Sequence, residues 1–187
     1  MSTVPDANAV SRLIAHHLLG DVGDGGTYMI IDAARDPSIY PALAAHQDEL
    51  EIMSLYQGQA AENLADVAPY LIRLQADAPF VRWLTIENWG KSWGIFLRAS
   101  ADFQAVRRRM RRFTVAATES GQTIMFRFYD PRVLRLFLPI GEPEQLTAMF
   151  TDIDAFLMED EDAQGLISFQ LIDGALRPVR YAAAQMK

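Results

Sequence analysis

WGIFLRASADFQAVRRRMRRFTVAATESGQTIMFRFY, residues 93–129, is the stretch that decides the fold class. Its first apolar run, Trp93–Leu97, predicts a buried strand. Residues 114–129 predict a hairpin that turns at residues 120–121. Between them, Ala101–Arg112 predicts a helix whose core-facing side chains are Phe103, Val106, Met110 and Phe113. A strand, a helix and a hairpin in succession favour a mixed sheet covered by helices over a purely parallel sheet.

Strands and helices also alternate on both sides of this stretch. An acidic residue followed by proline predicts a helix start at Asp36-Pro37 and again at Asp130-Pro131. Apolar runs predict strands at Thr27–Ile31, Glu51–Tyr56, Pro69–Leu74 and Leu166–Ile172. The expected fold class is therefore α/β, of the mixed α+β kind.

The 187 residues divide into three segments. Residues 1–26 combine a short amphipathic helix with the glycine-rich connector Gly20–Gly26. Residues 27–150 form the expected α/β domain. Residues 151–187 contain an acidic cluster and one strand, which we interpret as a small, reduced C-terminal lobe.

The composition excludes several classes of protein. The chain contains no cysteine, so disulfides, thiolate metal ligands and cysteine nucleophiles are excluded, and a reducing compartment is favoured. There is no run of about 20 apolar residues, and the N-terminal sequence MSTVPDANAVSRL lacks the features of a signal peptide. We expect a cytoplasmic protein that does not bind a membrane.

The net charge of −7 hides a basic segment. Residues 98–135 carry nine arginines and only three acidic residues, so this segment is +6 and the remainder is −13. The arginines at 107–112 leave a nucleic-acid-binding module open as an alternative. The sequence pI of about 4.9 disfavours it, because nucleic-acid-binding domains are usually basic overall.

The sequence offers little support for catalysis. His16 and His17 are adjacent and His46 is remote, so the histidines lack the i, i+4 spacing of a zinc pair, and we expect no metal site. The connector Gly20–Gly26 precedes a strand, whereas a phosphate-binding loop follows one. One alternative remains, a small hydrolase or transferase that uses Asp32 and Asp130, which both follow predicted strands.

The segment ENWGKSWGIFLR, residues 87–98, concentrates aromatic side chains beside basic ones. Aromatic residues and arginine dominate the binding energy of many protein interfaces. Phe96 is predicted to be a core residue. Trp89, which lies beside Gly90 and Lys91, is expected to be accessible.

Six segments follow one another in a specific order: TYMIIDAARD (27–36), LYQG (55–58), LADVAPYLIRL (64–74), WGKSWGIFLRA (89–99), VRRRMRRF (106–113) and FRFYDPRVLRLFLP (126–139). Together they resemble the adaptor chaperones of bacterial type VI secretion, the Tap or Tec proteins. The resemblance extends over residues 27–150, about two thirds of the chain. Its most specific part is SWGIFLR followed by FRFYDPRV.

This resemblance implies a non-enzymatic protein without a cofactor. Members of the family bind a toxic effector in the cytoplasm and help to load it onto the VgrG spike protein. Their fold is described as an α/β N-terminal lobe followed by a helical lobe. Only 37 residues follow position 150 here, which implies a reduced version of the second lobe.

The resemblance also assigns motif positions in this sequence. Asp32, Asp130 and neighbouring arginines are expected to form ion pairs that hold the end of the sheet together. The full set of structural positions comprises Asp32, Arg35, Gly90, Gly94, Asp130 and Pro131. The partner-binding candidates are Trp89, Trp93, Arg98, Arg127, Tyr129 and Arg132.

Two modes of partner recognition are open at this point. A partner helix could lie in a groove, or a partner strand could join a free edge of the sheet. The strand 166–172 is a candidate edge, because Ser168 and Gln170 would face outward. An interior position for this strand is an equal alternative.

Overall fold

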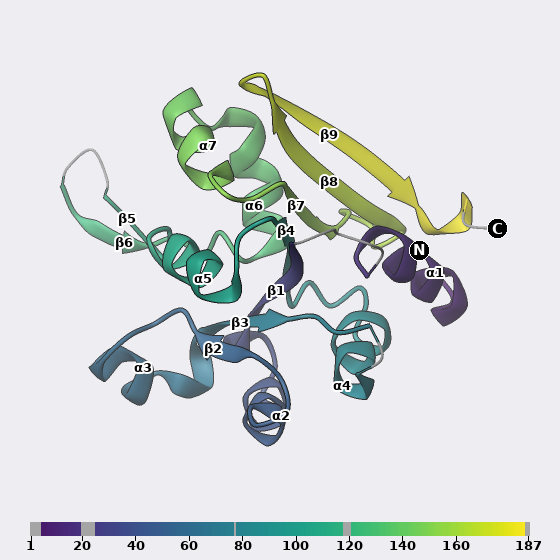
Figure 1. Cartoon of the computed structure of the whole chain (residues 1–187), viewed down its shortest axis with the longest axis horizontal. Coiled ribbons are helices and arrows are strands. Elements are labelled where there is room, and N and C mark those ends of the chain that lie inside the picture. Colours follow the sequence, from purple (N-terminus) through teal and green to yellow (C-terminus); the bar gives the residue numbers. More distant parts are fainter. Residues whose placement is uncertain (1–4, 20–24, 77, 118–120, 186–187) are drawn as a thin grey trace.

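The computed structural model describes residues 5–19, 25–76, 78–117 and 121–185. A seven-stranded sheet in the order β2-β3-β1-β4-β7-β8-β9 runs through the molecule (Figure 1). Every pairing in it is antiparallel. Its strands are β1 (Gly26–Asp32), β2 (Ile52–Ser54), β3 (Pro69–Arg73), β4 (Gly94–Ala99), β7 (Ala155–Glu159), β8 (Gly165–Ile172) and β9 (Ala175–Ala182).

Helices cover both faces of this sheet. The described α-helices are α1 (Ala7–His17), α2 (Ile39–His46), α3 (Gln59–Asn63), α4 (Pro79–Arg82), α5 (Phe103–Arg111), α6 (Pro131–Phe137) and α7 (Pro143–Phe150). Short turns of other helix types extend or connect them: η1 (Ala33–Arg35), η2 (Ala65–Val67), η3 (Trp83–Glu87), η4 (Leu138–Ile140) and η5 (Ala183–Gln185). The predicted fold class, a sheet covered by helices, is confirmed.

The two faces of the sheet form two separate hydrophobic cores. Along β1, Met29 and Ile31 pack with α1, α2 and α4, whereas Tyr28 and Ile30 pack with α5, α6 and α7. This alternation follows from the two-residue period of a strand. Because both faces are covered, every residue of β1 is buried, and its sequence is a continuous apolar run rather than an alternating one.

The C-terminal segment differs from the prediction. Residues 155–182 do not stand apart as a lobe, because β7, β8 and β9 extend the same sheet beyond β4. The predicted strand 166–172 corresponds to β8, which lies between β7 and β9. Its proposed role as a free edge is therefore wrong, Ser168 is buried, and β9 is the edge on this side.

Two local predictions also need correction. The helix expected at Asp36 begins at Ile39, because the Asp36 carboxylate accepts hydrogen bonds from the backbone and hydroxyl of Ser38 instead of capping a helix. The hairpin exists as β5 (Val115–Ala117) paired with β6 (Thr123–Met125), in a sheet of its own. Its second arm ends at Met125. Residue 120 of the predicted turn and residues 20–24 of the connector lie outside the described residues.

Candidate functional site

The predicted motif residues meet where β1 ends and α6 begins. Asp32 is the last residue of β1, and its buried carboxylate has two partners. Oδ1 accepts the backbone N–H of Ala34 at 3.1 Å and so caps η1. Oδ2 forms an ion pair with the guanidinium of Arg127. The expected bridge from Asp32 to a neighbouring arginine is therefore not formed, because its partner lies 95 residues away in the chain.

Asp130 has a parallel arrangement at the start of α6. Its buried carboxylate accepts the backbone N–H of Arg132 at 3.0 Å and the Nε–H of the same residue at 2.9 Å. Burial acts to raise the pKa of Asp130, but the hydrogen bonds and charge of Arg132 outweigh it, and the pKa lies below its ordinary value. Asp130 is therefore both the predicted helix cap and one half of an ion pair.

Where β1 ends and α6 begins, which we call the joint, the three guanidinium groups of Arg35, Arg127 and Arg132 outnumber the two carboxylates of Asp32 and Asp130. Arg35 donates to the backbone oxygen of Lys91 at 3.3 Å, and its charge contributes to the lowered pKa of Asp130. The side chains of Arg127 and Arg132 are 45% and 53% exposed, whereas Asp32 and Asp130 are buried beneath them. A molecule that approaches this joint meets arginine rather than carboxylate.

A second group of motif residues forms the loop between η3 and β4. Glu159, at the end of β7, accepts the backbone N–H of Gly90 at 3.0 Å and that of Ser92 at 3.1 Å. Both loop residues have positive φ, +86° at Gly90 and +51° at Ser92, so the buried carboxylate holds a tightly curved backbone. Burial raises the pKa of Glu159, although the two amides and the nearby charge of Arg135 act in the opposite direction.

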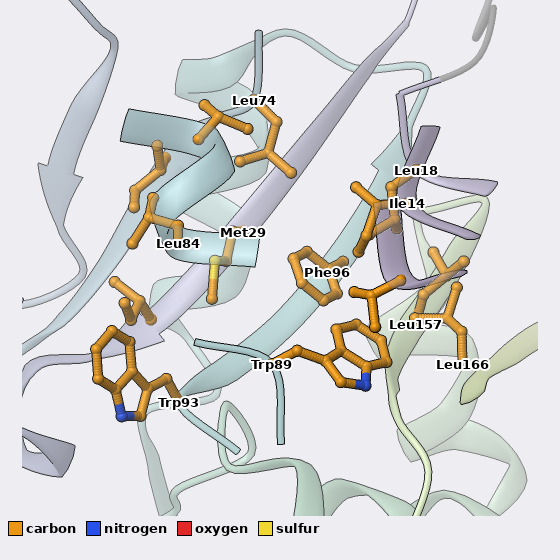
Figure 2. Packing of buried hydrophobic residues seen from close by; sticks show 14 of the residues in the cluster. Ile14, Leu18, Met29, Leu74, Leu84, Trp89, Trp93, Phe96, Leu157 and Leu166 are labelled. Carbon is orange, nitrogen blue, oxygen red and sulfur yellow. The ribbon is translucent and has the colours of Figure 1, made fainter. Parts of the chain in front are cut away.

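The two tryptophans of this loop belong to the hydrophobic core (Figure 2). Trp89 is only 6% exposed, and its indole N–H donates to the backbone oxygen of Ala163 at 2.9 Å. The prediction that Trp89 is accessible is wrong. Trp93 is buried against Trp83, and Phe96 is a core residue as predicted.

Tyr129 is also buried. Its ring packs edge-on against Phe128, and burial together with its contact to Tyr56 raises the pKa of its phenol. Arg98 lies elsewhere: it pairs in register with Thr27, at the opposite end of β1 from Asp32. Of the six partner-binding candidates, Arg127 and Arg132 are thus the two whose exposed side chains meet at this joint.

The arrangement of the carboxylates bears on the hydrolase alternative. A general base needs a carboxylate free to receive a proton from a substrate. The oxygens of Asp32 and Asp130 are already bound by backbone amides and arginines in helix caps. Because these oxygens are already engaged, the structure disfavours acid–base catalysis by Asp32 and Asp130.

The arginines of α5 mostly make contacts within the protein. Arg107 donates to the backbone oxygen of Ser54 at 2.8 Å, and Arg109 forms an ion pair with Asp152 at 2.8 Å. Arg111 contacts the side chain of Gln57. Among the five arginines of residues 107–112, only Arg108 and Arg112 are exposed, so the run does not present a continuous basic surface.

Glu159 and Arg135 were not among the site residues predicted from the sequence. Arg135 donates to the backbone oxygen of Glu159 at 2.6 Å and so joins α6 to β7. Glu159 opens the acidic run 159–162, which resembles a solvated turn in sequence. One sequence feature could have identified Glu159: it directly follows the apolar residues 155–158, as the last residue of a strand would.

Within the described ranges, no group of three histidine, aspartate or glutamate residues is placed to hold a metal ion. None of the helices in these ranges is long and apolar enough to cross a membrane.

Comparison with known proteins gives one match. A family model described as "Domain of unknown function (DUF4123)" matches residues 27–148. No curated protein and no solved structure matches the chain significantly. The matched range contains the whole joint between β1 and α6, and it ends before β7.

Proposed function

Because the chain belongs to the DUF4123 family, we propose that it is an adaptor chaperone of bacterial type VI secretion. In this function it binds a toxic effector in the cytoplasm and loads it onto the VgrG spike protein. The mechanism is protein–protein binding without turnover and without a cofactor.

One observation carries the proposal. The family match over residues 27–148 coincides with the six ordered segments, from TYMIIDAARD to FRFYDPRVLRLFLP, that resemble the Tap and Tec adaptors. Both the range and the order of the segments agree with a single adaptor domain.

The geometry of the joint between β1 and α6 adds physical support. Its carboxylates are engaged in caps and ion pairs, while Arg127 and Arg132 keep about half of their side chains exposed. Guanidinium groups in this position favour binding to acidic side chains or carbonyl groups of a partner. They favour this function over proton transfer by Asp32 and Asp130.

A pull-down with the tagged full chain tests the proposal. We expect a VgrG-type spike protein or a toxin-like effector to co-purify from the native cytoplasm. Arg132→Ala should recover about tenfold less partner, because arginines are frequent hot spots of interfaces. Arg177→Ala, an exposed arginine on the edge strand β9, is the matched control and should recover the wild-type amount.

The fold of each variant is checked first by circular dichroism, because Arg132 also pairs with buried Asp130. Wild-type protein that recovers neither partner from cells that demonstrably contain both would overturn the adaptor function. Equal recovery by Arg132→Ala would instead remove only this arginine from the binding surface.

A further inference from the structure

Helix α1 precedes the family-matched range and covers part of one face of the sheet. Its side chains Ile14 and Leu18 belong to the same hydrophobic core as Phe96 of β4, Leu157 of β7 and Leu166 of β8 (Figure 2). These five side chains are almost completely buried. The attachment of α1 therefore determines whether this apolar part of the sheet is closed or accessible.

The last turn of α1 is attached to the sheet through His17. The imidazole ring of His17 stacks on the ring of Tyr181 in β9, with 3.8 Å between the ring centroids and an interplanar angle of 21°. The ring of His16 contacts His17 edge-on, at a centroid distance of 4.6 Å. Directly after His17, the backbone oxygen of Leu18 accepts a hydrogen bond from the hydroxyl of Thr27 at 2.6 Å. The stack on Tyr181 thus joins the end of α1 to the edge strand.

The charged groups around His17 are basic. Arg98 of β4, which pairs in register with Thr27, acts on His17 through its charge, as does His16. The guanidinium of Arg98 has no hydrogen-bond or ion-pair partner among the described residues, so no described carboxylate is bound to it. The other charged residue of α1 is Arg12, one turn before His16.

The elements packed against α1 provide no carboxylate for His17 within the described residues. Two of these elements, η5 and β8, contain no charged residue. In η3, Glu87 pairs with Arg82 of α4 at 3.7 Å. On β9, Arg180 extends from the opposite face of the strand to Tyr181. A proton on His17 therefore adds a positive charge beside other basic groups.

Burial, together with His16 and Arg98, lowers the pKa of His17 below its ordinary value of 6.5. The negative end of the α1 dipole and the face of the Tyr181 ring attract a cation, but burial and the like charges outweigh them. In the unfolded chain, His17 binds a proton at a higher pH than in the folded chain. The stability that neutral His17 contributes is therefore present above pH 6.5 and is lost as the pH falls toward the folded pKa.

We propose that α1 is an acid-sensitive cover of the sheet: a proton on His17 places a second positive charge beside Arg98, weakens the contact with Tyr181 and releases the helix from the apolar surface beneath it. At neutral pH His17 is uncharged and the cover stays closed. In the released state Phe96 and Leu157 become accessible to solvent. This inference goes beyond the proposed adaptor function and does not depend on it.

Hydrogen–deuterium exchange of the full chain tests this inference at about pH 7.5 and about pH 5.5. Protection factors, which correct for the intrinsic pH dependence of exchange, report the local opening of each helix. We expect the protection of α1 to fall by at least about threefold between the two pH values, whereas that of α5 stays constant. Helix α5 also packs on the sheet, but it contains no histidine.

Three substitutions connect the fall to His17. His17→Phe keeps an aromatic ring against Tyr181 but cannot bind a proton, so α1 should be equally protected at both pH values. Arg98→Gln removes the nearby charge and should make the fall smaller. His46→Gln is the matched control and should retain the full fall, because His46 also lies in the last turn of a helix and stacks on an aromatic ring, that of Phe80 at 4.2 Å.

Equal protection of α1 at both pH values in the wild type would overturn the inference. So would a fall that persists unchanged in His17→Phe or in Arg98→Gln, because the charge of His17 beside Arg98 would then not be its cause. A loss of protection shared equally by α1 and α5 would also overturn it, because the whole chain would then unfold and α1 would not open separately.

Discussion

At the scale of single residues, four carboxylates are buried in the described structure, those of Asp32, Asp130, Glu159 and Asp160. The first three share one property, because each lies at the end or the start of an element. Asp32 ends β1, Asp130 begins α6, and Glu159 ends β7. Each accepts backbone N–H groups that the local fold would otherwise leave without partners. Buried charged groups of this kind add little net stability, but they specify one geometry, because removing a partner leaves a buried charge.

Glu159 gives a pH dependence that can be measured. Its folded-state pKa is raised by burial above the ordinary value of 4.5. Between these two values the folded chain holds a proton that the unfolded chain has released, so this contribution to stability is lost as the pH rises through the folded pKa. The free energy of unfolding of the wild type, minus that of Glu159→Gln, should therefore decrease as the pH rises above 4.5.

Urea denaturation at a series of pH values measures this difference. Glu161→Gln, the same substitution at an exposed neighbour, is the matched control. A difference for Glu159→Gln that increases with pH would contradict the assigned role of burial.

The sequence identified the paired residues Asp32 and Asp130, because an acid that follows a strand and precedes proline or a helical turn has a local pattern. It did not identify which arginine pairs with Asp32, since Arg127 is 95 residues away in the chain. The burial of Trp89 was missed for the same reason. Its covering residue, Ala163, comes from the turn between β7 and β8, which no local pattern connects to it.

At the scale of elements, the pairing of β1 with β4 leaves no room for a side chain at Gly94. A Cβ atom at this position would lie 2.1 Å from the backbone oxygen of Ile30. No rotation of a flexible side chain relieves this contact, because the obstacle is backbone. The register between the two central strands therefore requires a glycine here.

Gly94→Ala should consequently destabilise the protein by at least about 3 kcal/mol, in the range of severe core substitutions. Gly174→Ala is the control. It adds the same methyl group at a turn with φ of +74° and open space, and should cost only about 1 kcal/mol. Thermal unfolding followed by circular dichroism compares the two. Similar melting temperatures of the two variants would contradict this, because β1 and β4 could then move apart without loss of stability.

Not all elements were equally predictable. The central strands have continuous apolar runs, and the sequence placed β1, β3 and β4 to within a few residues. The edge strand β9 was missed, because Pro178 and two arginines interrupt its apolar pattern. These residues suit an edge, where a missing N–H is tolerated and charge blocks pairing with another chain.

At the scale of the whole molecule, the family-matched range and the folded sheet do not coincide. The match ends at residue 148, but β7, β8 and β9 follow it and pair onto β4. Phe156 and Leu157 of β7 are buried in the cores on opposite faces of the sheet. The matched range alone would leave β4 as an apolar edge.

A chain that ends at residue 151 should therefore be insoluble or unfolded when expressed alone. The physical reason is the exposure of the β4 edge and of both cores beside it. A chain that ends at residue 185 retains every described strand and serves as the control. Soluble yield and near-UV circular dichroism compare the two chains. A soluble, cooperatively folded short chain would show that the domain folds without β7, β8 and β9.

The position of β4 in the sheet also affects the protein during its synthesis. Its neighbour β1 is made before it, but its other neighbour, β7, follows more than 50 residues later. At about 5–20 residues per second, β4 waits several seconds on the ribosome with one edge unpaired. In that interval the nascent chain carries an apolar strand edge, and its rate of translation sets how long this edge is open to other chains.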